Sequence, residues 1–230
     1  MCHARRFNLF GSAVVLAGCD GSLSTLAPAG PAADAIASLW WAMLAGSAAI
    51  FAVVIFLFVQ VIRRPGWGSS VSPAGWIVLG GLVLPAMVLT PLVAYALITG
   101  ERLLLLPGPR QHIDAEGQQW SWTFRYPGEG GVKTVDVLHL PAGIPVEIAA
   151  SSVDVIHSFW IPRFAGKIDA VPGHVNLLRI QADEPGRYEG QCSEFCGIGH
   201  ARMRFAVIVH PAKDFSAELA RAAASSKVNE

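Results

Sequence analysis

The sequence predicts a membrane-anchored all-β protein, in which a hairpin of two transmembrane helices is followed by a β-sandwich. Hydrophobic residues make up 53% of the 230-residue chain and charged residues only 15%, which is too apolar for a purely soluble domain of this size. Two long uncharged stretches occupy much of the first hundred residues. Short segments with strand-like patterns occupy most of the rest, which favours a sandwich or barrel.

The first nineteen residues are typical of an export signal. Arg5 and Arg6 precede an apolar stretch over 7–17 that is too short to cross a bilayer. The ending Leu-Ala-Gly-Cys resembles a bacterial lipoprotein box, which predicts that Cys19 is lipidated and becomes the new N-terminus. An uncleaved start with an incidental cysteine is the alternative. The small residues that follow predict a linker over 20–38.

Two transmembrane helices are predicted near 39–62 and 75–99, so that the hairpin covers 39–99. Each uncharged stretch exceeds the roughly 20 residues that cross a hydrocarbon core. Arg63 and Arg64 are the only charges in the intervening loop, and the positive-inside rule places this loop in the cytoplasm. We therefore expect a multi-pass protein of the bacterial inner membrane with its large C-terminal part in the periplasm.

The C-terminal part, 103–230, is predicted to form the sandwich. A helix is expected over 214–227, with Asp214 as a possible N-cap. The net charge of zero gives no case for nucleic-acid binding, and no phosphate-binding glycine loop or Ser/His/Asp motif occurs. His112, His139 and His210 lack motif support and are expected at the surface or at strand ends. The predicted strands cover 119–127, 132–140, 145–151, 175–182 and 203–210.

One short stretch, "QCSEFCGIGHARM" over 191–203, gathers several metal-binding side chains. Cys192, Cys196, His200 and Met203 offer two thiolates, an imidazole and a thioether. Soft sulfur donors with imidazole select copper, whereas zinc favours ligands drawn from cysteine and histidine alone. A disulfide is the alternative in an exported domain, but it leaves the histidine and the methionine without a role.

His157, in "DVIHSFWIP", is the candidate for a remote ligand. Taken alone, it would be a histidine satisfied within the core. Beside the copper loop it brings the set to two thiolates and two imidazoles, with the Met203 thioether as a weak extra donor. Two thiolates could bridge two copper ions, each capped by one histidine, whereas a single ion would leave ligands unused.

These motifs resemble subunit II of the haem-copper cytochrome c oxidases. The family pattern Cys-Ser-Glu-x-Cys-Gly-x-x-His-x-x-Met is matched from Cys192 to Met203. Strings similar to "QWSWTFRYP", "DVIHSFWIP" and "KIDAVPG" occur in the same order in family members. The resemblance extends over nearly the whole chain and implies that the sandwich is cupredoxin-like and carries a binuclear copper centre, CuA.

The resemblance also implies a role for each ligand. Cys192 and Cys196 would bridge the two coppers, while His157 and His200 would cap one each. The set would be completed by the Met203 thioether and by the backbone carbonyl of Glu194, whose side chain in the family reaches a magnesium ion at the boundary with subunit I.

The implied function is electron entry into an oxidase. Reduced cytochrome c would dock, an electron would enter through Trp120, and the coppers would pass it to haem in subunit I, where oxygen is reduced. Trp120 could equally be a half-buried strand aromatic. Asp154 occupies a family docking position for the basic donor, and Asp136 and Glu129 are weaker candidates that could simply be solvated charges. Subunit I, other oxidase subunits and cytochrome c are the expected partners.

The sequence departs from the family at two places. The start of the second helix reads "SPAGWIVLGG", without the carboxylate that is proposed in many members as a proton entry point. His174 replaces the usual arginine in "DAVPGH". Two rival functions have less support from the residues. A quinol oxidase subunit II lacks the copper ligands that are present here, and a membrane-tethered copper chaperone usually has a thioredoxin-like fold.

Overall fold

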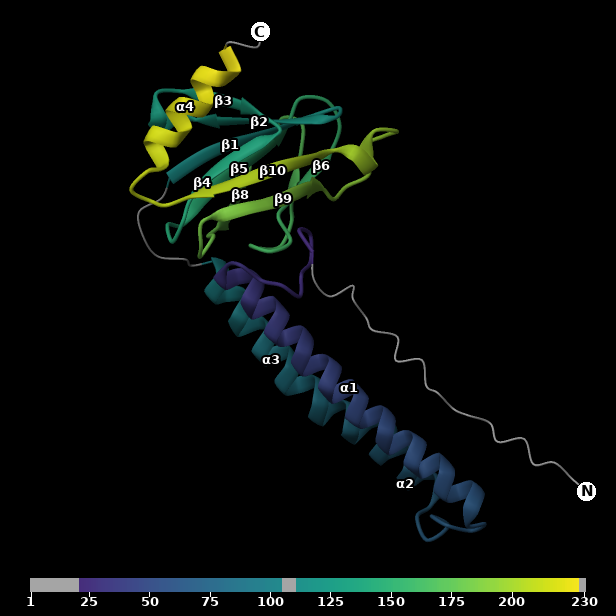
Figure 1. The fold of residues 1–230 in the computed structure, drawn as a ribbon. Helices are drawn as coiled ribbons and strands as arrows, with labels where there is room; N and C mark the ends of the chain where they lie inside the picture. Colours follow the sequence, from purple (N-terminus) through teal and green to yellow (C-terminus); the bar gives the residue numbers. More distant parts are fainter. Residues whose placement is uncertain (1–20, 105–110, 228–230) are drawn as a thin grey trace, which may run out of the picture.

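The computed structural model describes residues 21–104 and 111–227 (Figure 1). The predicted export signal and the lipidation of Cys19 lie outside the described residues. The described chain divides into a long helical hairpin and a β-sandwich stacked on one end of it.

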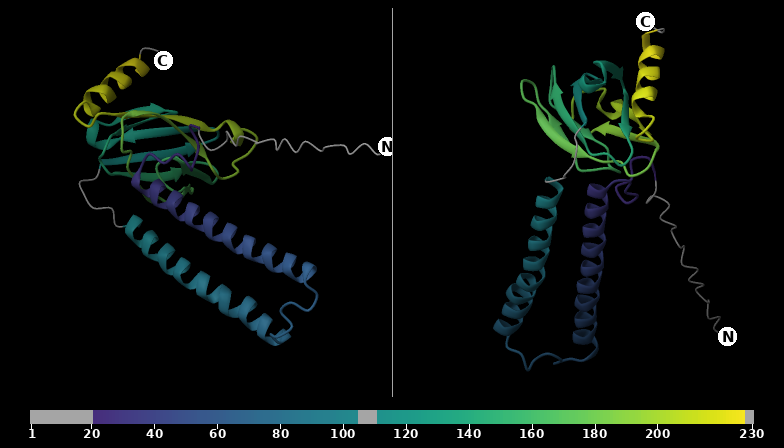
Figure 2. Two further views of the ribbon diagram at one scale, coloured as in Figure 1. Left: turned by 60° about the horizontal axis from the view of Figure 1, so that its bottom comes forward. Right: turned by 90° about the vertical axis from the view of Figure 1, so that its left-hand side faces the viewer.

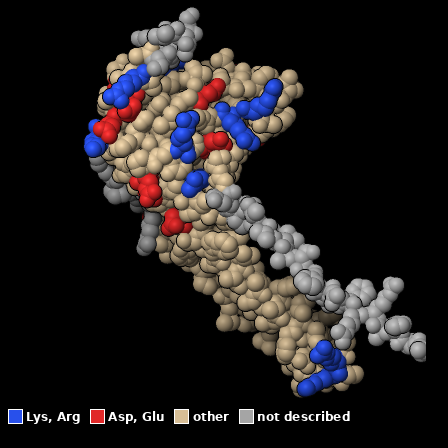
Figure 3. Space-filling view, in the orientation of Figure 1, with Lys and Arg blue, Asp and Glu red and all other residues tan. Residues whose placement is uncertain are grey.

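The hairpin has one helix on each side of a short loop. Helix α1 runs over Pro31–Arg63, and the second limb runs through α2 (Pro73–Val78), the π-helical turn η2 (Leu79–Val83) and α3 (Leu84–Leu104). Both limbs are long and apolar enough to cross a membrane, with mean hydropathies of 2.6 and 2.3, and neither apolar window is buried. Because core helices of soluble proteins bury such faces, the hairpin is a membrane anchor. Basic side chains appear at its far tip (Figure 3), where the loop carries Arg63 and Arg64.

The second limb is interrupted by the π-helical turn η2, which lies directly before a proline. Pro85 has no N–H group, so the carbonyl of Gly81 cannot receive the usual helical hydrogen bond. The turn widens directly before this proline, where the Leu84 N–H donates to the carbonyl of Leu79. The Ser72 hydroxyl caps the start of the limb by accepting the Gly75 N–H at 3.1 Å.

The C-terminal part is a sandwich of two five-stranded sheets, which confirms the predicted fold class. One sheet has the order β3-β2-β1-β5-β8 and the other β4-β10-β9-β6-β7, and α4 packs across β3 and β4 on the side away from the hairpin (Figure 2). The elements are β1 (Gln111–Gln118), β2 (Ser121–Tyr126), η3 (Pro127–Glu129), β3 (Val132–Val135), β4 (Val137–Pro141), β5 (Val146–Ser152), β6 (His157–Trp160), β7 (Ile168–Ala170), β8 (Asn176–Ile180), β9 (Gly186–Cys192), η4 (His200–Arg202), β10 (Arg204–His210) and α4 (Phe215–Lys227).

The strand predicted over 132–140 is two strands in different sheets. Asp136 separates them with a φ of 54°, a left-handed conformation that ends β3 and turns the chain into β4. Its carboxylate accepts the Trp122 N–H at 2.7 Å, and its own N–H donates to the Trp122 carbonyl. Asp tolerates this conformation because its short side chain bonds to nearby backbone, and the alternating pattern on either side of it hides the break.

The prediction of a linker over 20–38 is wrong in two respects: a helix begins within this range, and the segment before the helix is hydrogen-bonded to the sandwich. Helix α1 begins at Pro31, since the alanine-rich stretch after it is a good helix former and proline suits a first helical position. The segment before the helix is bound to the sandwich. The Ala29 N–H donates to the Arg163 carbonyl at 2.7 Å, and the Ala29 carbonyl accepts the Asp183 N–H at 2.9 Å. Gly30 is required there, because a Cβ atom would collide with the Gln181 carbonyl oxygen.

Aromatic rings fill the core between the sheets. Trp122 lies edge-on to Phe159 and Phe205, with ring centroids 5.7 and 5.9 Å apart. Trp122 also lies 6.0 Å from the His157 ring, so the core extends without interruption to the end of the sandwich that carries the predicted copper ligands.

His139 is buried, which corrects the prediction that it lies at the surface or a strand end. Its Nδ1 lies 2.8 Å from Nε2 of His210, and the two rings stack with centroids 5.1 Å apart. Burial and then the nearby His210 lower the pKa of His139 from 6.5 to about 4. The ring is therefore neutral in the folded protein at neutral pH.

We expect the sandwich to lose stability as the pH falls from about 6.5 towards about 4. The unfolded chain takes up a proton at His139 below pH 6.5, whereas the folded chain does so only near pH 4, which costs at most about 3 kcal/mol. The free energy of unfolding, measured with denaturant at several pH values in this range, should fall less steeply with decreasing pH in His139→Gln than in the unmodified chain. The exposed His112→Gln is the matched control, and a pH dependence changed equally by both would contradict the assignment.

Candidate metal centre

Five of the predicted ligand residues come together at one end of the sandwich, where β6, β9 and β10 meet. His157 begins β6, Cys192 ends β9, and Met203 directly precedes β10. Phe159 of β6 pairs with Cys192, and the Cys192 N–H donates to the Met203 carbonyl at 2.9 Å. The loop between Cys192 and Met203, which carries Cys196 and His200, is thus closed at its base by backbone pairing.

The donor atoms of these residues face one another. The two cysteine Sγ atoms are 3.8 Å apart, and the Sγ of Cys196 lies 3.7 Å from the Sδ of Met203. The Nδ1 of His157 lies 3.8 Å from the Sγ of Cys192, and the Nδ1 of His200 lies 3.7 Å from the Sγ of Cys196. Each thiol therefore has one imidazole beside it, and in both histidines the nitrogen nearest the sulfur is Nδ1.

This geometry bears on the choice between a disulfide and a metal. The cysteines are free, and their Sγ separation of 3.8 Å is far longer than the roughly 2.0 Å of a disulfide. It is less than twice a thiolate–metal bond of about 2.3 Å, so one ion can touch both sulfurs. His157, Cys192 and Cys196 are all buried and offer donor atoms within 4.8 Å of one another. The residues present fit a metal of the soft, copper-like class.

Burial, and after it the neighbouring Cys192, raise the pKa of the Cys196 thiol to about 11. A thiolate at this position would be an uncompensated charge in an apolar setting. A bound cation removes that cost by replacing the proton, so the site favours metal over a bare thiolate.

Asp154 holds His157 from behind. Its carboxylate oxygen lies 2.9 Å from the Nε2 of His157, which leaves Nδ1 directed at the sulfurs. The same carboxylate accepts the backbone N–H groups of Gln119 at 2.7 Å and Val155 at 2.6 Å. Burial alone would raise the pKa of Asp154, but these hydrogen bonds and the one to His157 together lower it to about 2.

Glu194 contributes two different groups. Its backbone carbonyl lies 3.2 Å from the Sγ of Cys192, within the ligand cluster. Its side chain forms an ion pair with Lys167, with an Oε2 atom 3.6 Å from the Nζ of that lysine. Lys167 follows the segment 163–164, whose carbonyls accept N–H groups from Ala29 and Ala33, so this carboxylate lies on the side of the sandwich nearest the hairpin.

Trp120 lies flat against the ligand loop. Its Nε1–H donates to the Cys196 carbonyl at 3.2 Å, and the Gln119 amide donates to the same oxygen at 2.8 Å. The indole covers Gly199 so closely that a Cβ atom there would collide with the ring. The ring is 38% exposed, so it joins a buried ligand residue to the surface.

Sequence reasoning missed three residues that shape the site: Gln119, Gly117 and Gly199. The Gln119 backbone anchors Asp154 and its amide binds the Cys196 carbonyl. Gly117 leaves room for the His157 ring, since a Cβ atom there would lie 2.9 Å from Cδ2 of that ring. The position of Gln119 next to Trp120 in "QQWSW" could have suggested a role for the glutamine. The two glycines are needed because His157 and Trp120 pack against them, and a single sequence does not reveal such contacts.

The three predicted docking acids lie in different settings. The Asp154 carboxylate is hydrogen-bonded to His157 and backbone groups. The Asp136 carboxylate is half-buried and bonded to the Trp122 N–H, and burial raises its pKa. Glu129 follows the far end of β2 from Trp120 and accepts the Ser216 hydroxyl at 3.1 Å. The structure therefore does not bring these three carboxylates together as a free acidic surface beside Trp120.

Comparisons with known proteins identify the family of this chain. Residues 132–210 match the family model described as cytochrome c oxidase subunit II, periplasmic domain. The chain is 31% identical over 205 residues to the alternative cytochrome c oxidase subunit 2 of Bradyrhizobium diazoefficiens, covering 73% of each chain. The chain belongs to the cytochrome c oxidase subunit II family.

Other members of the family extend the comparison. Cytochrome c oxidase subunit 2 of Alkalihalophilus pseudofirmus is 32% identical over an alignment of 223 positions, which covers 88% of this chain and 63% of the length of that relative. The crystal structure of the periplasmic domain of subunit II of cytochrome oxidase of Bradyrhizobium japonicum aligns with 51% of this chain and 96% of that one, at 31% identity and a TM-score of 0.48.

Quinol oxidase subunits belong to the same set of relatives. Quinol oxidase subunit 2 of Bacillus cereus is 30% identical over 211 residues, covering 84% of this chain and 70% of that one. Overall similarity therefore assigns the chain to subunit II of the haem-copper oxidases without fixing the electron donor. The residues of the ligand cluster must decide between the two kinds of oxidase.

Asp154→Asn should weaken copper binding by about ten- to one hundred-fold, because the amide fixes the His157 ring less well than the carboxylate does. The affinity is measured on the full-length chain in detergent by competition with a chelator. Asp114→Asn, which changes an exposed carboxylate bonded to His112, is the matched control. Equal affinities for the two variants would mean that Asp154 does not position the ligand.

Proposed function

We propose that this chain is the electron-entry subunit of a cytochrome c oxidase and holds a binuclear copper centre. The observation that carries the proposal is the pairing of each thiol with its own imidazole, at 3.8 and 3.7 Å, around two sulfurs 3.8 Å apart. Cys192 and Cys196 would bridge two copper ions, and His157 and His200 would cap one each. Met203 and the Glu194 carbonyl would complete the set.

The chemistry supplied by the bound copper pair is the uptake and release of one electron. The protein contributes a rigid, dry ligand frame, because most ligands are buried and the loop is closed by β-pairing. Such a frame limits the movement of ligands between redox states, which favours fast transfer. Asp154 keeps the His157 Nδ1 directed at the sulfurs.

Trp120 would be the point of electron entry. Its half-exposed indole donates a hydrogen bond to the carbonyl of Cys196, a proposed bridging ligand, so the path from the surface to the metal is one residue long. Electrons would come from a reduced cytochrome c and pass to haem in subunit I, where oxygen is reduced.

The proposed function also implies where the chain lies in an oxidase complex. The hairpin would lie in the bacterial inner membrane beside subunit I, with the 63–64 loop in the cytoplasm and the sandwich in the periplasm. The Glu194 side chain, on the face nearest the hairpin, would reach a magnesium ion at the subunit I boundary. Lipidation of Cys19 would add a second anchor. The second limb has no carboxylate at its start for proton uptake, and His174 replaces the usual arginine.

The rival functions lack comparable support. The full copper ligand set would have no purpose in a quinol oxidase subunit. A copper chaperone would not need the Trp120 contact with the ligand loop, and the chain carries a β-sandwich rather than a thioredoxin-like fold.

We expect the full-length chain in detergent to bind two copper ions per chain. Metal analysis gives the count, and the electron paramagnetic resonance spectrum should show one unpaired electron shared by two copper nuclei. His112→Gln, an exposed histidine, should leave the count at two, whereas Cys196→Ser should abolish the shared-electron spectrum. A single copper with an ordinary one-copper spectrum in the unmodified chain would contradict the bridging arrangement.

Trp120→Phe should slow electron uptake from reduced cytochrome c by at least about ten-fold, because the indole N–H bond to the Cys196 carbonyl is lost, while the copper spectrum stays the same. Stopped-flow mixing of the copper-loaded chain with reduced cytochrome c measures the rate. Trp160→Phe is the matched control. The indole N–H of Trp160, at the end of β6, donates a hydrogen bond to the Ala165 carbonyl and does not contact the ligand loop. Unchanged kinetics in Trp120→Phe would remove this residue from the path.

A further inference from the structure

The loop at the tip of the hairpin folds against the start of the second limb. The Trp76 Nε1–H, in α2, donates to the Gly68 carbonyl at 3.2 Å. Gly68 has a φ of 86°, which glycine adopts readily, and a Cβ atom there would lie 3.3 Å from the Trp76 ring. The centroids of the Trp67 and Trp76 rings are 6.5 Å apart, and the Trp67 N–H donates to the Arg64 carbonyl at 2.9 Å. Two indoles are thus held together where the limbs meet.

The two indoles form one wall of an apolar hollow of about 440 Å³. The opposite wall is one face of the last turns of α1, because the lining residues there are three or four positions apart. These residues are Val54, Leu57, Phe58 and Val61. Three of them, all except Leu57, are more than half exposed, so the hollow is open to the surroundings of the hairpin. A hollow of this size and lining suits an apolar chain.

The hollow lies at the level where the membrane ends. No charged residue occurs in 35–62 or in 65–100, so Arg63 and Arg64 mark the boundary between the hydrocarbon core and water at this end of the hairpin (Figure 3). Tryptophans concentrate at such boundaries. Val61 and Trp67, which line the hollow, lie on either side of the two arginines in the chain. The hollow therefore adjoins lipid acyl chains, and the arginines beside it adjoin lipid head groups.

The positive charge at the hairpin tip has no acidic partner. Within the described chain neither Arg63 nor Arg64 forms an ion pair, and both are exposed. The nearest acids in the sequence, Asp34 and Glu101, lie at the other end of the limbs. Arg64 is the C-cap residue of α1, about one turn beyond Val61, next to the face that lines the hollow. The guanidinium groups are therefore available to a ligand that enters the hollow.

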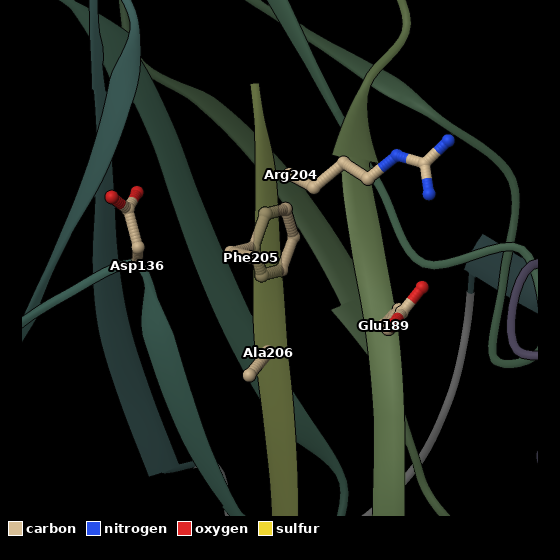
Figure 4. A pocket seen from close by; sticks show the side chains of 5 residues that line it. All are labelled: Asp136, Glu189, Arg204, Phe205 and Ala206. Atoms are coloured by element: carbon tan, nitrogen blue, oxygen red, sulfur yellow. The ribbon is translucent and has the colours of Figure 1, made fainter. Parts of the chain in front are cut away.

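Two hollows on the sandwich differ in this respect, because each contains charges of both signs. Figure 4 shows Arg204 in a hollow of about 170 Å³ over β9 and β10, which Asp136 and Glu189 also line. The hollow between α1 and β8 holds Arg179 and Glu147, whose Nε and Oε2 atoms are 3.6 Å apart. These hollows contain their own counter-charges, whereas the tip of the hairpin carries an unpaired positive charge that favours an anionic ligand.

We propose that the hollow at the hairpin tip binds an anionic phospholipid of the surrounding bilayer. One acyl chain lies against the two indoles and α1, and the phosphate pairs with Arg63 and Arg64. Guanidinium groups bind phosphate oxygens bidentately, and indoles are suited to the level between acyl chain and head group. The proposal rests on the hairpin as a membrane anchor and is independent of the copper centre.

Native mass spectrometry of the full-length chain in detergent measures the lipid preference. Phosphatidylglycerol and phosphatidylethanolamine with the same acyl chains are added in equal amounts. The chain should retain the anionic lipid at least about five-fold more than the zwitterionic one. The double substitution Arg63→Gln and Arg64→Gln should reduce this ratio to about one, whereas Arg63→Lys with Arg64→Lys should still favour the anionic lipid, because the charge is kept.

The acyl-chain contact is tested separately. Phe58→Ala should lower the retention of both lipids by about three-fold or more, because it removes a ring from the hollow. Phe56→Ala is the matched control. Phe56 is exposed to a similar extent, 55% against 63%, but lies two positions earlier, on the opposite face of α1. Circular dichroism of each variant checks that the helices of the hairpin have formed.

Any of three results would overturn the proposal: equal retention of both lipids, a preference that survives the double glutamine substitution, or equal effects of Phe58→Ala and Phe56→Ala. So would absence of the anionic lipid from the purified oxidase complex, because a neighbouring subunit would then cover the hollow. Copper binding, measured on the same samples, is the separate test of the proposed function, and failure of the lipid proposal would leave it in place.

Discussion

The metal end of this molecule depends on the closure of one loop by backbone pairing. The Cys192 N–H donates to the Met203 carbonyl, which closes the loop carrying Cys196 and His200 into a short turn between β9 and β10. Strand β6 pairs with β9 and brings His157 alongside. Without this junction, five soft or imidazole donors would be spread over the 47 residues from 157 to 203 and would not meet at one metal site. The metal chemistry is thus a consequence of strand pairing and of the aromatic core beneath it.

The surrounding residues refine this arrangement from two directions. From within, Asp154 links the β1–β2 turn to His157, and Gly117 gives the His157 ring its space. From outside, Trp120 covers Gly199 and bonds to the Cys196 carbonyl. One turn, 117–120, therefore both positions a ligand and connects the site to the surface. The segment before α1 is hydrogen-bonded to the sandwich through Ala29. These bonds fix the position of the sandwich, and with it the metal site, relative to the hairpin.

Much of this architecture could be predicted from sequence because it rests on strong local patterns. Long uncharged stretches gave the hairpin, and the spacing of Cys192, Cys196, His200 and Met203 indicated the ligand loop. What could not be predicted depends on contacts between distant segments. Asp136 breaks an alternating run because its carboxylate binds Trp122, the Ala29 segment is ordered by Arg163 and Asp183, and His139 is buried against His210. The hydrogen bonds of the Asp136 and Asp154 carboxylates to backbone groups of the 119–122 segment depend in the same way on contacts between distant segments.

The arrangement proposed for the metal has both cysteine sulfurs bridging two coppers, each with an imidazole of its own. X-ray absorption at the copper edge of the loaded, full-length chain can examine this arrangement, because it counts the sulfur and nitrogen neighbours of the metal. A bridged pair should show two sulfur neighbours and one imidazole nitrogen for each copper, together with a second copper nearby. One sulfur neighbour per copper, with no copper neighbour, would rule out the bridged pair.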